Sequence, residues 1–152
     1  MDPFYSVPRK KSSVFHPLTV SALIILCWCI PLAAAVLAGK GHGAGIWNIF
    51  EIIALAATVL ASVMYGWRTL DTNGAVLIGI LPFLLVMTVI RFGTGNLPVT
   101  SHHLVNTVVY IAVLCIIGGL EGYFASRPDW KFRGIAIILA GAWIGVFLSG
   151  ID

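Results

Sequence analysis

Five long apolar stretches, separated by short polar links, constrain the fold of this chain more than any other feature of its sequence. They are residues 18–39, 47–67, 74–90, 103–124 and 132–149. A helix that crosses a bilayer needs about 20 mainly apolar residues, and each stretch comes close to this length. Hydrophobic residues make up 59% of the chain and charged residues 10%, which is far from the composition of soluble domains. The sequence therefore predicts an all-α integral membrane protein with five transmembrane helices, or four if the fifth and weakest stretch lies at the membrane surface.

The chain divides into a basic N-terminal segment, residues 1–17, and a single transmembrane domain, residues 18–152. The run Arg9-Lys10-Lys11 precedes the first apolar stretch as it would in a signal peptide, but that stretch is longer than the apolar core of a typical signal. We expect it to remain as the first helix. Because the links are short, consecutive helices should be antiparallel neighbours in one bundle.

Lysine and arginine are distributed unevenly between the two predicted sides of the membrane. The outer segments carry two of these residues, Lys40 and Arg91. The inner segments carry seven: Arg9, Lys10, Lys11, Arg68, Arg127, Lys131 and Arg133. Loops rich in lysine and arginine stay in the cytoplasm. The distribution therefore predicts a cytoplasmic N-terminus and a C-terminus on the opposite side.

Small residues recur at four-residue spacing on two of the predicted helices. They are Ala54, Thr58 and Ser62 on the second helix, and Gly141 and Gly145 on the fifth. Small side chains let the backbones of two membrane helices approach closely. These rows predict a compact bundle or an interface between subunits.

Two prolines and two tryptophans lie in the middle of predicted spans. Pro31 and Pro82 each remove one backbone hydrogen bond, which commonly kinks a helix, and a kink can serve packing or gating. Trp28 and Trp143 each carry an indole N–H that needs a partner in the apolar interior. Packing between helices is one interpretation of these tryptophans, and contact with a pigment or quinone is the other.

Ionisable groups inside a bilayer are costly, so each is a functional hypothesis that requires a named partner. Glu51 lies about one turn inside the outer end of the second span, and Arg91 ends the third span on the same side. We predict an ion pair between them. Glu121 lies near the inner end of the fourth span, and an arginine at that side could neutralise it. The candidates are Arg68, Arg127 and Arg133.

Three histidines, His42, His102 and His103, are predicted on the outer side of the membrane, close in depth to Asn106 and Glu51. Imidazoles beside a carboxylate are typical ligands of zinc, copper and haem. A haem or metal site is therefore one hypothesis for this side. The alternative is that the histidines are interfacial loop residues that bind lipid headgroups or a neighbouring subunit.

Several classes of function receive no support from the sequence. It has no GxSxG elbow, HExxH pair, Walker loop or paired mid-membrane aspartates, so we do not expect an enzyme. Beyond residues 9–11 the basic residues form no run, and a nucleic-acid partner is not expected. The cysteines lie within apolar stretches and are interpreted as packing residues: Cys27, Cys29 and Cys115.

The lack of a complete site and of extramembrane mass favours a non-catalytic, accessory or structural subunit of a larger membrane complex. Respiratory, photosynthetic and oxygenase complexes are the candidates, and the partners would be the bilayer, other subunits or further copies of the chain. One alternative is a small electron-transfer protein that binds haem or a metal ion through the outer histidines. The other is an oligomeric carrier or channel with Glu51 and Glu121 on its pathway. No cofactor is required by the sequence.

Overall fold

The computed structural model describes the backbone of residues 16–38, 44–89 and 101–149, and the side chains of residues 16–33, 52–89 and 104–149. The five elements in these ranges are all α-helices, as predicted. They are α1 (Pro17–Ala38), α2 (Ala44–Thr69), α3 (Thr72–Thr88), α4 (Ser101–Ala125) and α5 (Trp130–Ser149). Each end lies within three residues of the predicted end, because the apolar stretches and the polar links between them are sharply separated.

Three of the helices are long and apolar enough to cross a membrane within the described residues. The qualifying segments are Ile52–Thr69, Leu104–Ala125 and Trp130–Ser149. The described part of α1, Pro17–Ala33, and α3, Thr72–Thr88, are also apolar but shorter. The fifth stretch, expected to be the weakest, is thus one of the three that meet the length of a span.

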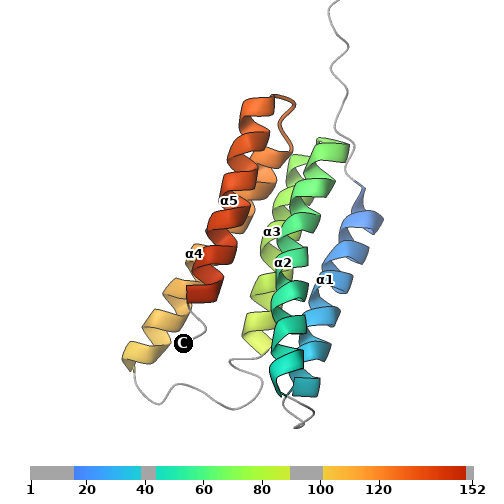
Figure 1. The fold of residues 1–152 in the computed structure, drawn as a ribbon. Helices are drawn as coiled ribbons and strands as arrows, with labels where there is room; N and C mark the ends of the chain where they lie inside the picture. Colours follow the sequence, from blue (N-terminus) through green and yellow to red (C-terminus); the bar gives the residue numbers. More distant parts are fainter. Residues whose placement is uncertain (1–15, 39–43, 90–100, 150–152) are drawn as a thin grey trace, which may run out of the picture.

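The helices form one bundle in which consecutive helices run in opposite directions (Figure 1). Helices α1, α2 and α3 pack against one another, α3 packs on α4, and α5 packs on α4 and α2. At one end of the bundle α1, α3 and α5 begin and α2 and α4 end. We call this the basic end, because the described lysines and arginines lie there: Arg68, Arg127, Lys131 and Arg133.

Glycines bring α3 and α4 into close contact. A Cβ added at Gly79 would overlap the carbonyl oxygen of Gly118, and a Cβ at Gly118 would overlap that of Gly79. One turn further along, a Cβ at Gly122 would lie 2.5 Å from the carbonyl oxygen of Ala75, to which the Ser62 hydroxyl of α2 donates a 3.0 Å hydrogen bond. Three helices are therefore joined at this crossing.

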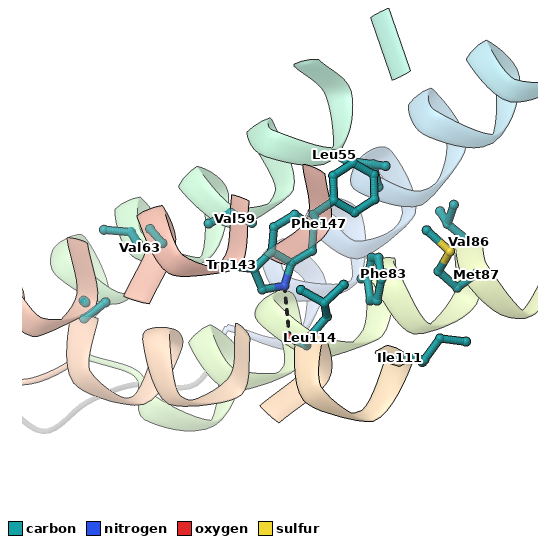
Figure 2. Close-up of a cluster of buried hydrophobic side chains, with 13 residues drawn as sticks. Leu55, Val59, Val63, Phe83, Val86, Met87, Ile111, Leu114, Trp143 and Phe147 are labelled. Carbon is teal, nitrogen blue, oxygen red and sulfur yellow. Dashed lines mark hydrogen bonds between the residues drawn. The ribbon is translucent and has the colours of Figure 1, made fainter. Parts of the chain in front are cut away.

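An aromatic cluster fills the space between α3, α4 and α5 (Figure 2). The Phe83 ring meets the Trp143 ring edge to face at 5.2 Å between centroids, and Phe147 stacks on Trp143 at 5.4 Å. The indole Nε1–H of Trp143 donates a 3.0 Å hydrogen bond to the carbonyl oxygen of Leu114. The Tyr110 hydroxyl donates a 3.0 Å bond to the carbonyl of Phe147. Trp143 is therefore a packing residue, which is the first of the two interpretations of its mid-span position.

A two-residue turn at Leu70 and Asp71 joins α2 to α3. Leu70 has a φ of 56°, which reverses the chain direction, and Asp71 caps α3 by accepting a 3.2 Å hydrogen bond from the Gly74 amide. The second carboxylate oxygen of Asp71 accepts a 2.8 Å bond from the Tyr65 hydroxyl. Asp71 is only 3% exposed, and these donors satisfy both of its oxygens. Tyr65, 6% exposed, is therefore part of this buried turn.

The two rows of small residues have different positions in the bundle. Thr58 and Ser62 of α2 are buried in the interior, at 4% and 0% exposure, which agrees with a compact bundle. By contrast, a Cβ added at Gly141 or Gly145 of α5 would meet nothing within 4 Å. The row on α5 therefore takes no part in packing among the described residues.

Both mid-span prolines lie inside continuous helices. Pro31 is within α1 and Pro82 within α3, and both side chains are almost completely buried between helices. A kink at either position stays a prediction.

Candidate functional site

The interior face of α4 carries one carboxyl group. Leu114, Gly118, Glu121 and Ala125 recur at three- and four-residue spacing and are all buried, so they lie on one side of the helix. Leu114 and Ala125 belong to the largest apolar cluster of the described residues, to which α2, α3 and α5 also contribute. The same spacing places Glu121 on this face, and it is 0% exposed.

The Glu121 carboxyl group has no hydrogen-bond partner in the described part of the chain. Neither Oε1 nor Oε2 is within bonding distance of a donor. Asp71, the other acidic side chain of the buried set, has two donors on its oxygens. A polar group removed from water without a compensating bond costs free energy, and an ionised one costs more. Burial of Glu121 without a partner therefore costs folding free energy, and packing alone does not explain why a carboxyl group lies there.

Two further polar groups without partners lie at the basic end, on the helices that pack against α4. They are the indole Nε1–H of Trp67, in the last turn of α2, and the Nε–H of Arg133, in the first turn of α5. The Arg133 guanidinium lies over the Trp67 ring, 5.8 Å from its centroid. Glu121 lies about one turn before the end of α4, close to the same end of the bundle.

The three groups complement one another chemically. Glu121 of α4 offers two acceptor oxygens, whereas Trp67 of α2 and Arg133 of α5 each offer an unused N–H donor. Buried polar groups of this kind are commonly satisfied by bound water.

The predicted neutralisation of Glu121 by an arginine is not realised as an ion pair among the described residues. The Arg127 guanidinium instead donates to the Tyr123 hydroxyl and lies 4.5 Å from the centroid of that ring. Arg133 lies over Trp67, and Arg68 lines a groove between α1 and α2.

The predicted outer-side residues lie mostly outside the described side chains. This applies to His42, His102, His103, Glu51 and Arg91, so the haem or metal hypothesis and the Glu51–Arg91 pair stay predictions. Asn106 is described, and its side chain is exposed on α4. The starts of α2 and α4, which carry Glu51 and the histidine pair, lie at the same end of the bundle (Figure 1).

No group of three metal-ligating side chains occurs within the described ranges. Of the cysteines, Cys27 is buried and Cys115 is half-buried, which agrees with a packing role, whereas Cys29 is exposed and does not pack among the described residues. Trp28, the other mid-span tryptophan, is half-buried, and its indole N–H has no partner among the described residues.

Two features of the basic end were missed by reasoning from the sequence. The Asp71 cap has a recognisable signal, an aspartate three residues before the amide that it binds at a helix start. The approach of Arg133 to Trp67 has none, because 66 positions separate the two residues in the chain.

Comparison with known proteins gives no match: no protein-family model, curated protein or solved structure is significantly similar to this chain.

Proposed function

We propose that this chain is a five-span integral membrane protein that acts as a non-catalytic subunit of a larger membrane complex. The topology has a cytoplasmic N-terminus and a C-terminus on the opposite side. Three span-length helices, the alternating helix directions and the four lysines and arginines at the basic end support it. In this topology the basic end faces the cytoplasm.

The outward face of α5 is the observation that carries the proposed subunit role. Gly134, Ile138, Gly141 and Gly145 follow one another at three- and four-residue spacing, so they lie on one side of the helix. A Cβ at any of the three glycines would meet nothing within 4 Å, and Ile138 is 72% exposed.

Glycine is unfavourable within a helix by about 1 kcal/mol relative to alanine, so three glycines on one lipid-exposed face need a reason. Elsewhere in this bundle the reason is visible, because Gly79 and Gly118 let α3 and α4 touch. The same use on α5 requires a helix from another chain. We infer that a membrane helix of a partner subunit packs against Gly141 and Gly145.

Replacement of Gly141 with leucine tests this interface. The change should leave the bundle folded, since nothing lies within 4 Å of the new Cβ, and should release the chain from its assembly. The mass of the complex purified in mild detergent is the measurement. Ala112→Leu is the matched control, because Ala112 is an exposed small residue on α4, away from this face.

A larger assembly that is lost in Gly141→Leu and kept in Ala112→Leu supports the proposal. A wild-type chain that purifies as a monomer from its native membrane, with the same mass as Gly141→Leu, contradicts it.

The buried Glu121 carboxyl, which has no partner among the described residues, favours a second candidate function, an oligomeric carrier or channel with Glu121 on its pathway. A buried carboxyl group without a partner inside a membrane bundle is typical of ion and proton pathways. Purified protein in liposomes should then pass protons or potassium ions, measured with a pH-sensitive dye and an ion electrode. Glu121→Gln should abolish the flux and Arg127→Gln should keep it. Equal flux through wild type and Glu121→Gln rules this function out.

A further inference from the structure

A groove of about 510 Å³ runs between α1 and α2 at the basic end. Its lining residues are His16, Thr19, Leu23, Ala61, Met64, Tyr65, Arg68 and Thr69. Thr19, Met64 and Arg68 are exposed, so the groove is open to the exterior of the bundle along its side. It is separate from the interior face of α4 and from the glycine face of α5.

The groove has a polar rim and an apolar wall. His16 directly precedes α1, and Arg68 lies in the last turn of α2, so both belong to the end of the bundle. Leu23 lies seven residues after His16, or about 10 Å deeper along the helix. Leu23 and Ala61 also pack on a buried cluster that includes Val20, and this cluster forms the base of the wall.

The charge of the lining selects the class of ligand. Two basic side chains, His16 and Arg68, line the groove together with the hydroxyl-bearing Thr19, and no acidic side chain of the described residues does. The guanidinium group of arginine has a donor geometry that matches a phosphate group. Below the rim, the apolar wall can accept only hydrocarbon without losing hydrogen bonds.

From this arrangement we propose that the groove between α1 and α2 is a binding site for an anionic phospholipid. The phosphate of the lipid binds Arg68 and His16 at the rim, and the first part of one acyl chain lies along Leu23, Ala61 and Met64. The remainder of the chain continues into the surrounding bilayer. A zwitterionic phospholipid fits the wall equally well, but its choline group adds a positive charge beside Arg68.

Native mass spectrometry of the purified full-length chain tests the proposal. Detergent-solubilised protein is titrated with dioleoyl phosphatidylglycerol and, separately, with dioleoyl phosphatidylcholine. We expect phosphatidylglycerol to bind about tenfold more tightly, because the choline group of phosphatidylcholine places a positive charge beside Arg68. Arg68→Gln should remove this preference, because it weakens the binding of phosphatidylglycerol more than that of phosphatidylcholine.

Arg127→Gln is the matched control. Arg127 is an exposed arginine at the same end of the bundle but does not line the groove, and its replacement should keep the preference. Glycerol 3-phosphate supplies the anionic head without acyl chains and should compete only weakly. Three results would overturn the proposal. The wild type could bind both lipids equally, or the preference for phosphatidylglycerol could be lost equally in Arg68→Gln and Arg127→Gln. The third is competition by glycerol 3-phosphate that is as strong as competition by the lipid.

Discussion

At the scale of single residues, the two buried acids of the described interior differ in their surroundings. Asp71 accepts bonds from the Tyr65 hydroxyl and the Gly74 amide, and it holds the turn between α2 and α3. Glu121 is fully buried without a donor among the described residues. Asp71 therefore stabilises the fold through its hydrogen bonds, whereas the burial of Glu121 destabilises it.

Replacing the two acids should have opposite effects on stability. Glu121→Met removes an unsatisfied polar group of similar length, and we expect the free energy of unfolding to rise by about 1–3 kcal/mol. Asp71→Ala removes a helix cap and leaves the Tyr65 hydroxyl without its acceptor, which should lower it by about 2 kcal/mol. Thermal unfolding in detergent measures both. A less stable Glu121→Met variant would mean that bound water or another group satisfies the carboxyl.

The two mid-span tryptophans provide a second comparison. Trp143→Phe loses the hydrogen bond to the Leu114 carbonyl. We expect this lost bond to lower the free energy of unfolding by about 1 kcal/mol, in addition to the effect of the smaller ring. Trp28→Phe is the matched control, since its indole N–H has no partner among the described residues. The same unfolding assay applies, and equal losses for the two variants would argue against the Trp143 bond.

At the scale of elements, the contact of α3 with α4 depends on the absence of side chains at two positions. Gly79 and Gly118 face each other so closely that a methyl group on either would overlap the carbonyl oxygen of the other. Because this contact is made of backbone, it cannot relax by a change of rotamer. The glycines of α5 have open space instead, so the two sets should respond differently to substitution.

Alanine substitution separates the two sets of glycines. Gly118→Ala should destabilise the isolated chain by at least about 1–3 kcal/mol, because the helices must move apart. Gly141→Ala should stabilise it by about 0.5–1 kcal/mol, through the lower flexibility of the unfolded chain. Circular dichroism during thermal unfolding measures both changes. A stable Gly118→Ala variant would show that α3 and α4 do not meet as closely as described.

At the scale of the whole molecule, packing contacts between helices hold the two parts of the bundle together. Helices α1, α2 and α3 pack together, and α4 and α5 are attached to them through the glycine contact of α3 and through α2 (Figure 1). Consecutive helices alternate in direction, so all odd-numbered helices begin at the basic end. The bundle therefore has two distinct ends, and the described lysines and arginines all lie at the basic end.

The proposed five-span topology predicts which positions are accessible from outside the cell. In a variant whose cysteines 27, 29 and 115 are replaced by alanine, a single new cysteine is introduced at Gly41, Arg127 or Gly150. A membrane-impermeant maleimide applied to intact cells should label positions 41 and 150 and should leave 127 unlabelled until the membrane is opened. Labelling of position 127 from outside would reverse the orientation, and protection of position 150 alone would mean that the last helix does not cross.

The sequence alone was sufficient to predict the five helices and their approximate ends. In apolar segments of this length, the backbone groups are satisfied by hydrogen bonds within the segment itself. The apolar stretches and polar links therefore mark the helix ends, and Glu121 stands out as an ionisable group within a span. The expectation that the fifth stretch is the weakest was wrong, because Trp130–Ser149 has the length of a span and a mean hydropathy of 1.9, above the 1.4 of Ile52–Thr69 in α2.

The tertiary structure decided what each helix face contacts. Spacing identified the small residues of α2 and α5 alike, yet Ser62 lies in the interior and Gly141 faces outward. Spacing also could not show that Arg133 approaches Trp67 while Glu121 has no donor. Periodicity within one helix defines which residues share a face, but the neighbour of that face is set by how distant segments pack, and no local pattern contains that information.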